Sequence, residues 1–519
     1  MLQAKHLYGL LDAGATENPD APAFRYRNER LTYGDWRRLA ERMSAVFAAR
    51  GVGRGDVVTL LLPTTPLYQV AYLATSRLGA ITTGINVRYR RTEIGHILQR
   101  SGARLVFGVD AFYGADFRGM IEALRPELPE LRETLWVDAK EVTDGTAAVV
   151  EKLAGDLATP PPADVQPSDP VAIVFTSGTT GIPKGAWYAH ENVLALAEIE
   201  TRRYKSRRPP AAHLVTGVSF AHVGFMARAG IGLSHQTCTI IHDEFDPAAV
   251  LETIERERLS DIGGFPTQVV LLLDHPDCAK RDMSSVETVL LGGAPSTPAL
   301  IRRVQETLKA RVSVRYSSTE IGIGSASLPD DPPEILATTV GKPTSGVELR
   351  IVDDENRPLP TGEYGNVVVR SGATMRGYWR DEEATRKTID EAGWIHTGDV
   401  GAVDEAGYVH LRGRQSEMYI RGGFNVYPSE IEDLLGKHPK VARAAIVGLP
   451  DDVHGEIGCA FVVPRKPDDP PTLAELRAWV GDSLASFKRP DRLTLLPELP
   501  ATPMFKIDKR ALKEIGLRG

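Results

Sequence analysis

The chain has 519 residues, more than one hydrophobic core usually organises, so its length predicts two or more domains. Its net charge of −7 and pI of about 6.0 argue against nucleic acid as the main partner, because nucleic-acid binding usually requires a basic face. The three cysteines lie far apart and form no C-x-x-C pair, which argues against a disulfide framework and a cysteine-ligated metal site and favours a reducing compartment.

Residues 1–20 lack the charged-then-apolar pattern of a secretory signal, and no apolar run reaches the roughly 18 residues that a membrane span needs. Apolar runs at residues 57–62 and 104–107 alternate with helix-like stretches such as residues 36–49. This alternation is typical of parallel sheets covered by helices. We therefore expect a cytoplasmic α/β protein with no membrane span.

A proline-rich linker, residues 158–170, leads into the most informative segment, residues 171–185, which reads VAIVFTSGTTGIPKG. Its five leading apolar residues predict a strand buried on both faces. The following loop suits phosphates, because glycines let backbone N–H groups approach, hydroxyls donate hydrogen bonds and a lysine adds a mobile charge. The candidate phosphate-binding residues are Thr176, Ser177, Gly178, Thr179, Thr180 and Lys184. The loop is not a Walker loop, since Pro183 precedes the lysine and Gly185 follows it.

In the last third of the chain, the pattern of apolar runs and turn residues changes at two places. From residue 340 to about residue 369, short apolar runs are separated by Gly, Pro and Asp turns, which suggests barrel-like β structure. After Gly413 a Gly-rich, charged stretch indicates a boundary, beyond which strand-like and helix-like segments are mixed. A separate, smaller α+β unit is therefore expected at the C-terminal end.

Further segments, in order along nearly the whole chain, resemble the motifs of the acyl-adenylating superfamily, which includes acyl-CoA synthetases, peptide-synthetase adenylation domains and luciferases. Besides the phosphate loop, these segments are residues 18–23, 31–33, 290–295 (LLGGAP), 316–320 (YSSTE), 393–399 (GWIHTGD), 413–414, 422–432 (GGFNVYPSEIE) and 499–507 (LPATPMFKI). The resemblance implies an α/β fold with a large N-terminal domain, residues 1–415, made of two doubly wound subdomains and a β-barrel. A small mobile α+β domain, residues 416–519, would follow and carry the catalytic lysine.

The resemblance also implies a reaction: ATP activates a carboxylic acid to acyl-AMP with release of pyrophosphate, and the acyl group then passes to coenzyme A. The acid and the α-phosphate are both anionic, so cations and fixed donors must offset their repulsion. Two unit charges about 4 Å apart interact by about 4 kcal/mol at an effective dielectric constant of about 20. One well-placed lysine can therefore change the reaction rate by orders of magnitude.

Four residues match the catalytic positions of this family. Lys506 matches the catalytic lysine, Thr319 the α-phosphate contact and Glu320 the ligand of Mg2+, a hard cation that prefers oxygen ligands. His222 matches a position beside the carboxylate site, where we expect it to gate the acyl pocket.

The nucleotide and the thiol have their own candidate residues. Tyr316 is expected to offer an aromatic face to adenine, and Asp399 to accept the ribose hydroxyls, while Arg414 reaches the sugar or a phosphate. The segment expected beside the base is Gly292, Gly293, Ala294 and Pro295. The resemblance implies that Gly422 and Gly423 line a narrow channel for the pantetheine thiol.

The sequence departs from the family pattern at two places near the moving domain. Phe505 stands where Gly usually precedes the catalytic lysine, and Ser416 stands at the pivot where Asp or Lys is usual. A small polar residue can still serve as a hinge. Lys509, beside the catalytic lysine, looks like an ordinary surface lysine.

The sequence leaves several alternatives open. The acceptor can be free coenzyme A, the phosphopantetheine of a separate carrier protein, or an amine. A non-catalytic nucleotide-binding protein is disfavoured by the phosphate loop together with Glu320, Asp399 and Lys506, and luciferase-like oxidation rests on fold analogy alone. The expected acyl-pocket walls are largely small and apolar, which favours an aliphatic or aromatic acid over an α-amino acid; they are residues 222–227, 263–267, 291–295 and 321–325. The identity of the acid and the oligomeric state are not encoded in any motif.

Overall fold

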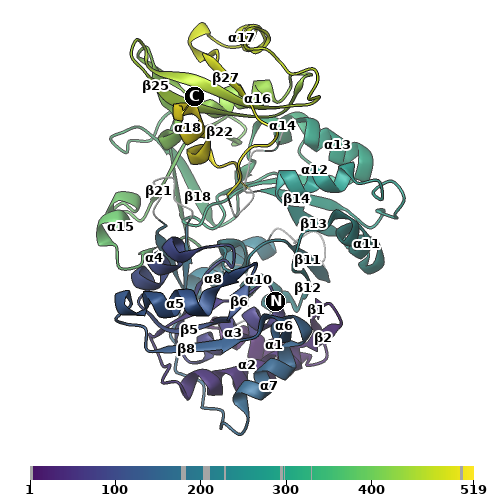
Figure 1. The fold of residues 1–519 in the computed structure, drawn as a ribbon, viewed down its shortest axis with the longest axis vertical. Coiled ribbons are helices and arrows are strands. Elements are labelled where there is room, and N and C mark those ends of the chain that lie inside the picture. The colour runs from purple at the N-terminus through teal and green to yellow at the C-terminus, as the bar shows by residue number, and fades with distance from the viewer. Residues whose placement is uncertain are drawn as a thin grey trace.

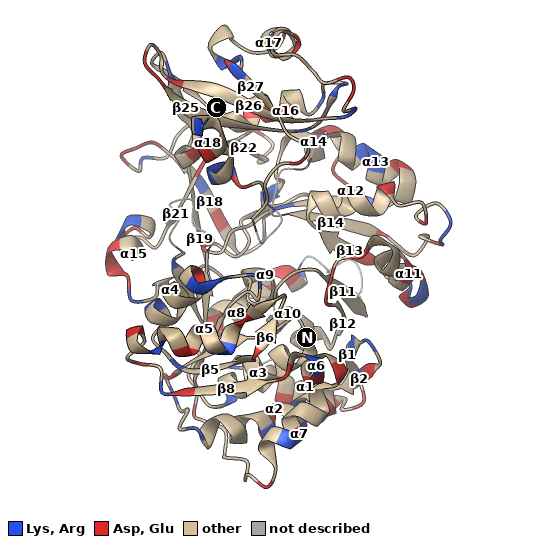
Figure 2. Ribbon diagram, viewed as in Figure 1, with Lys and Arg blue, Asp and Glu red and all other residues tan. Residues whose placement is uncertain are grey.

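The chain forms a large body that contains the N-terminal residues and a smaller body, coloured yellow-green to yellow, at its C-terminal end (Figure 1). The computed structural model describes residues 4–176, 183–202, 211–226, 229–292, 296, 298–328, 330–502 and 506–518. Positively and negatively charged residues are interspersed along the ribbon (Figure 2), as expected for a chain of modest net charge. The division into a large and a small body confirms the predicted α/β architecture, with a large N-terminal part and a small C-terminal part.

The first sheet of the large body has seven strands, five of them parallel and two, β10 and β20, antiparallel. Across the sheet they are β20 (Gly377–Tyr378), β10 (Gly185–Ala189), β9 (Pro170–Phe175), β4 (Ile81–Gly84), β3 (Val57–Leu61), β5 (Ala103–Val109) and β8 (Glu133–Val137). The helices of this region are α2 (Tyr33–Ala48), α3 (Pro66–Arg77), α4 (Arg91–Ser101), α5 (Phe117–Leu124) and α7 (Thr146–Ala154). The buried strand predicted before the phosphate loop is β9, whose four central residues are all buried.

Helix α2 begins where the sequence places a capping signal. The Thr32 hydroxyl accepts a hydrogen bond from the Asp35 N–H at 3.1 Å, and the Asp35 carboxylate accepts the Thr32 N–H at 3.0 Å. This reciprocal pair satisfies two backbone donors at the helix start. Its apolar side then packs on helix α3, which is buried at every residue. The predicted helix over residues 36–49 is therefore confirmed, with its start three residues earlier.

Two further sheets complete the α/β part. In the second, β11 (Ala212–Thr216), β12 (Cys238–His242) and β1 (Pro22–Tyr26) are parallel, and β2 (Glu29–Thr32) is antiparallel. In the third, three parallel strands are followed by two short antiparallel ones: β13 (Asp261–Gly264), β14 (Thr288–Gly292), β15 (Arg311–Tyr316), β16 (Ser325–Ala326) and β17 (Lys342–Pro343). Strands β13, β14 and β15 end at one edge, where ligands of open α/β sheets usually bind.

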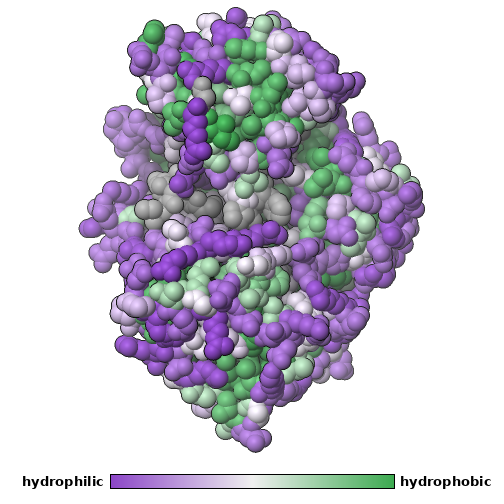
Figure 3. All heavy atoms as spheres, in the orientation of Figure 1, coloured by the Kyte–Doolittle hydropathy of each residue, from purple (hydrophilic) through white to green (hydrophobic). Residues whose placement is uncertain are grey.

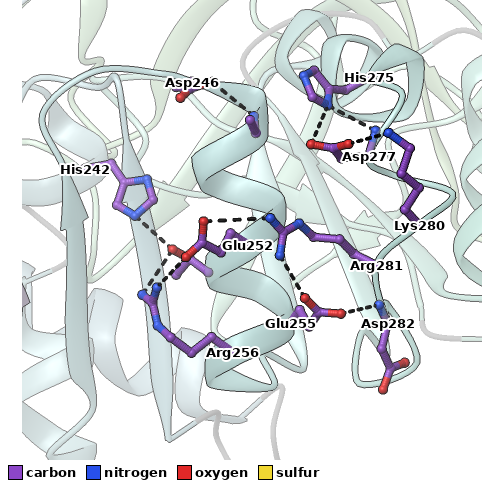
Figure 4. Close-up of polar contacts among 12 residues, drawn as sticks. His242, Asp246, Glu252, Glu255, Arg256, His275, Asp277, Lys280, Arg281 and Asp282 are labelled. Atoms are coloured by element: carbon purple, nitrogen blue, oxygen red, sulfur yellow. Dashed lines mark hydrogen bonds and ion pairs between the residues drawn. The ribbon is translucent and has the colours of Figure 1, made fainter.

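Charged side chains on the outer surface of this region pair with one another around helix α11 (Pro247–Glu257) (Figure 4). Arg281 contacts both Glu255, at 2.9 Å, and Glu252, at 3.7 Å. The His242 ring nitrogen lies 3.1 Å from the Thr253 hydroxyl. These contacts fix the helix on its sheet, and as exposed pairs each contributes about 1 kcal/mol or less to stability.

The barrel-like β structure predicted from residue 340 is a four-stranded antiparallel sheet, and it joins the two bodies. Its strands are β18 (Val347–Val352), β19 (Gly365–Ser371), β21 (Ile395–Val403) and β22 (Val409–Arg414). A single 3-10 turn, Gln415–Glu417, follows β22 and leads into the small body.

The small body surrounds hydrophobic cores of its own. Its sheet contains β23 (Tyr419–Arg421), β24 (Phe424–Val426), β25 (Val441–Asp451), β26 (Gly455–Pro464) and β27 (Arg492–Leu495). Its helices are α16 (Pro428–Leu435), α17 (Leu473–Gly481) and α18 (Lys509–Arg518). Two core clusters lie entirely within it, which is typical of a unit that can move as a rigid body.

Two surface properties concern possible contacts with other molecules. Figure 3 shows apolar surface on the small body. Among the apolar side chains of this body, Leu495, Ile515 and Leu517 are exposed. No helix among the described residues is long and apolar enough to cross a membrane.

Candidate active site

A carboxylate from the antiparallel sheet meets a tyrosine from the parallel sheet. Asp399 on β21 faces Arg414 on β22, with 3.2 Å between the Arg414 Nε and the Asp399 Oδ1. The Tyr316 hydroxyl, at the end of β15, donates to the Asp399 Oδ2 at 2.5 Å. Burial raises the pKa of the Asp399 carboxyl, while the charge of Arg414 and the hydrogen bond from Tyr316 oppose that shift. The side chain is thus fixed by two donors, yet each oxygen keeps a lone pair for a further donor.

The sequence predicted that the Tyr316 ring offers an exposed face to adenine, but the side chain is buried. Its exposed fraction is 7%, and Gly324 lies against its ring, where a Cβ would come within 2.9 Å of the ring edge. A side chain at Gly324 would therefore displace the ring and the hydroxyl that holds Asp399. The structure adds a role for Tyr316 that the sequence did not reveal, which is to orient this carboxylate.

Glu320 is held in place by two hydroxyl groups. The Ser318 hydroxyl donates to its Oε2 at 2.9 Å and the Tyr378 hydroxyl to its Oε1 at 3.0 Å. Its neighbour Thr319 has its carbonyl oxygen bonded by the Tyr188 hydroxyl. These hydrogen bonds leave lone pairs on an ordered carboxylate, as a cation ligand requires. Within the described part of the chain, no three His, Cys, Asp or Glu side chains group as a metal site, so a cation here would need other oxygens.

The described part of the phosphate loop lies beside Glu320. The Lys184 ammonium lies 5.1 Å from the centroid of the Tyr378 ring, whose hydroxyl contacts Glu320. The Thr176 N–H donates to the Lys184 carbonyl at 2.9 Å and closes the base of the loop. Gly292 ends strand β14. The predicted residues that lie outside the described residues are Ser177, Gly178, Thr179, Thr180, Gly293, Ala294, Pro295 and Phe505.

Lys506 reaches from the small body to these groups of the large body. Its backbone is held by two contacts: the Thr502 N–H donates to the Lys506 carbonyl at 2.7 Å, and residues 501 and 507 form an antiparallel bridge. The side chain remains accessible to water, but burial of its surroundings and the charge of Arg414 lower its pKa, while Glu320 and Asp399 raise it. The lysine therefore lies within electrostatic reach of all three charged residues of the site.

His222, from the large body, lies within electrostatic reach of Lys506. Its Nδ1 accepts the Gly224 N–H at 3.1 Å, which leaves Nε2 as the protonated nitrogen of a neutral ring. Burial and the charge of Lys506 lower the pKa of His222 to about 4. The imidazole is consequently neutral near pH 7, and it can donate one hydrogen bond without adding charge.

Gly422 and Gly423 form the turn between strands β23 and β24 of the small body. Both have left-handed φ angles, +57° and +85°, and the Gly422 N–H donates to the His454 carbonyl at 2.8 Å. The next residue, Phe424, stacks on Phe487 with 4.4 Å between ring centroids. The contacts of this loop are thus within the small body, and it is Lys506 that meets the charged groups of the large body.

Three residues of the site were missed from the sequence: Tyr188, Ser318 and Tyr378. Ser318 lay inside a quoted motif, and its position two residues before Glu320 was the available signal. Tyr188 and Tyr378 stand in strands β10 and β20, where an aromatic residue is usually part of a core. Lys509 was also misjudged: it is paired with Glu417 and Glu432 at 2.7 and 2.9 Å and is largely shielded from solvent.

Comparison with known proteins identifies what the chain is similar to. The family described as "AMP-binding enzyme" matches residues 11–379, and its C-terminal domain, "AMP-binding enzyme C-terminal domain", matches residues 430–506. A 3-[(3aS,4S,7aS)-7a-methyl-1,5-dioxo-octahydro-1H-inden-4-yl]propanoyl:CoA ligase from Mycobacterium tuberculosis (strain ATCC 25618 / H37Rv) is 37% identical, with 98% of each chain covered.

Two other matches differ in their printed activities. The fatty acid–[acyl-carrier-protein] ligase ScoC of Streptomyces coeruleorubidus is 32% identical and covers 96% of this chain and 94% of its own. The crystal structure of ATP-bound MatB from Rhodopseudomonas palustris superposes with a TM-score of 0.89 at 27% identity, with 99% of each chain covered.

Proposed function

This chain belongs to the AMP-binding enzyme family and is an AMP-forming acid–CoA ligase, and from this premise we propose how its residues carry out the two half-reactions. It activates a carboxylic acid with ATP to acyl-AMP, releasing pyrophosphate, and then transfers the acyl group to coenzyme A, releasing AMP. The substrates are thus ATP, a carboxylic acid and coenzyme A.

The observation that carries the residue assignment is that Lys506, from the small body, lies within electrostatic reach of Asp399, Arg414 and Glu320 of the large body. In the first half-reaction the acid carboxylate attacks the α-phosphorus, and negative charge builds on the phosphate oxygens. A lysine brought to this point by the small body supplies the opposing charge. We therefore assign Lys506 as the catalytic lysine and the described arrangement as the one that forms acyl-AMP.

The nucleotide is held by groups from three elements. The free lone pairs of Asp399 accept the ribose hydroxyls, and Arg414 contacts the sugar or a phosphate. The segment beginning at Gly292 lines the base, and the enclosed Tyr316 orients Asp399. The phosphate loop cradles the β- and γ-phosphates with the residues Thr176, Ser177, Gly178, Thr179, Thr180 and Lys184.

Mg2+ is the cation that fits Glu320. A single ordered carboxylate with free lone pairs, next to a phosphate loop, suits a cation that usually takes few protein ligands and completes its shell with phosphate oxygens and water. When bound, Mg2+ neutralises phosphate charge and orients the leaving pyrophosphate. Thr319, beside Glu320, contacts the α-phosphate.

His222 acts at the acid side of the site. Its neutral ring presents Nε2–H near Lys506, and the pKa of about 4 keeps it uncharged at neutral pH, so that it does not compete with the lysine for the anionic acid. We propose that it gates the acyl pocket and donates to the acid carboxylate before attack.

The second half-reaction requires a second arrangement of the two bodies. We propose that residues 1–415 and 416–519 are the moving units and that Ser416 is the pivot. Rotation removes Lys506 and brings Gly422 and Gly423 to the acyl-AMP, where a backbone without side chains leaves room for pantetheine.

The acid is proposed to be aliphatic or aromatic rather than an α-amino acid. The relative from Mycobacterium tuberculosis is named for a propanoate attached to a bicyclic ring, and the expected pocket walls of this chain contain small residues such as Gly224, Gly263 and Gly324. A carrier-protein acceptor remains a second candidate, because ScoC is named for that acceptor.

One experiment tests these assignments together. A panel of linear, aromatic and alicyclic acids is screened for pyrophosphate release with ATP and Mg2+, with and without coenzyme A, and thioesters are identified by mass spectrometry. We expect AMP, pyrophosphate and an acyl-CoA for at least one acid. Formation of ADP and phosphate would contradict adenylation, and release of AMP and pyrophosphate without any acyl-CoA would remove coenzyme A as the acceptor.

A further inference from the structure

The chain crosses from the large body to the small one beside a cluster of side chains centred on Arg412 and Glu430. Arg412 lies on β22, and its Nε lies 2.9 Å from the Oε1 of Glu430 on helix α16. The other carboxylate oxygen of Glu430 pairs with Lys488. The guanidinium of Arg412 lies 4.0 Å from the centroid of the Tyr364 ring. A second ring, that of Tyr427 in the small body, has its centroid 5.7 Å from the same guanidinium. One carboxylate thus joins two cations, and one arginine joins a carboxylate and two aromatic rings.

These residues lie on opposite sides of the proposed pivot. Arg412 and Tyr364 precede Ser416 and belong to the large body, whereas Glu430 and Lys488 follow it and belong to the small body. A rotation about Ser416 carries Glu430 and Lys488 together, so their contact persists. The same rotation carries Glu430 away from Arg412, whose contact with Tyr364 persists.

Helix α16 approaches strand β22 unusually closely, and a glycine permits this. Gly413 has φ +142°, and a Cβ on it would come within 2.9 Å of the Ser429 hydroxyl oxygen. That hydroxyl in turn donates to the carbonyl oxygen of Arg412. The N-terminal turn of α16 is therefore seated on the end of β22 in this arrangement.

We propose that the Arg412–Glu430 ion pair is a latch that stabilises the adenylate-forming arrangement over the thioester-forming one. The proposal rests on the proposed alternation about Ser416. Both groups are partly shielded, at 36% and 19% exposure, so their contact is stronger than that of a fully solvated pair.

The same geometry makes the latch reversible. A partly buried carboxylate that loses its only partner raises the free energy of the protein. Lys488 remains paired with Glu430 when Arg412 leaves, so this cost is avoided. The Tyr364 ring likewise continues to hold the released guanidinium by a cation–π contact. Each half of the latch therefore keeps one partner in either arrangement.

The test compares the two half-reactions in three variants. Arg412→Gln and Glu430→Gln each remove the latch, and Lys488→Gln is the matched control, because it removes a cation from the same carboxylate within one body. Acyl-AMP formation is followed by ATP–pyrophosphate exchange. Thioester formation is started from synthetic acyl-AMP and coenzyme A.

We expect each latch variant to raise the ratio of thioester formation to adenylation by about fivefold, mainly by slowing adenylation. The double variant should change the ratio no further, because its two changes break one interaction. Lys488→Gln should change the ratio in the opposite direction, lowering it, because release of Arg412 would then leave Glu430 without a cation partner. Equal loss of both half-reactions in Arg412→Gln, or additive effects in the double variant, would overturn the proposal.

A distance measurement separates this proposal from the proposed chemistry. The three native cysteines are buried, so spin labels can be placed at Glu355→Cys on the large body and Lys466→Cys on the small one. Arg412→Gln should raise the population of a second inter-label distance in the ligand-free protein. An unchanged distribution would refute the latch, whereas a shift in a protein that adenylates no acid would refute the proposed activity alone.

Discussion

Replacing Lys506 by alanine tests the central assignment, because the two half-reactions should respond differently. In the described arrangement Lys506 is the cation that the small body brings to Asp399, Arg414 and Glu320. At about 4 Å from a developing negative charge, with an effective dielectric constant of about 20, a unit charge contributes about 4 kcal/mol. Even if only two thirds of this applies in the transition state, Lys506→Ala should slow acyl-AMP formation by about 10²-fold, equivalent to about 2.7 kcal/mol.

The assay is ATP–pyrophosphate exchange for the first half-reaction and thioester formation from synthetic acyl-AMP for the second. Because Lys506 withdraws in the proposed second arrangement, thioester formation should change much less. The matched control is Lys513→Ala, which removes the same charge from an exposed position of helix α18 and should leave both rates unaltered. Equal loss in both half-reactions would refute the reasoning.

The other predictions concern the nucleotide, the thiol and pH. Asp399→Ala should raise the apparent KM for ATP about tenfold or more, because it removes the ribose acceptor and leaves Tyr316 and Arg414 without their shared partner, and circular dichroism should report an intact fold. Gly423→Leu should abolish thioester formation and spare adenylation; comparable loss of both would indicate that the strained φ of +85° has damaged folding instead. The folded His222 has a pKa of about 4 against 6.5 unfolded, so the unfolded chain binds more protons between these values and the stability lost on acidification from pH 6.5 to pH 4 is about 3 kcal/mol. Urea unfolding of His222→Gln should show a smaller loss over this range, and an identical pH dependence would exclude the shift.

Local patterns foretold local structure well. The apolar run before the phosphate loop is strand β9, and the amphipathic stretch from residue 36 is helix α2, because burial on one or both faces imposes a period that the sequence records. The break in rhythm after residue 340 likewise corresponds to the antiparallel strands β18 and β19.

The contacts within the site could not be foretold in the same way, because they join distant segments. Tyr316 and Asp399 are 83 positions apart, and Glu320 and Tyr378 are 58 apart. Motif resemblance placed Tyr316, Glu320 and Asp399 in one site, but no periodicity indicates that a tyrosine hydroxyl will orient a carboxylate. The tyrosines of β10 and β20 carried no motif at all, since strand aromatics ordinarily serve packing.

Lys509 connects the segment that carries the catalytic lysine to the junction between the two bodies. A lysine near a chain end is usually solvated, but this one is paired with Glu417, the residue after the proposed pivot, and with Glu432 on helix α16. Glu432 lies on the same helix as Glu430, the latch residue, and Lys509 follows Lys506 by three positions.

The pivot, helix α16 and the segment that presents Lys506 are therefore tied together by charge pairs inside the small body, and they must move as one. A contact that holds α16 against strand β22 then holds the catalytic lysine in the site as well. For this reason the Arg412–Glu430 pair can govern a reaction centre whose reacting groups it does not touch.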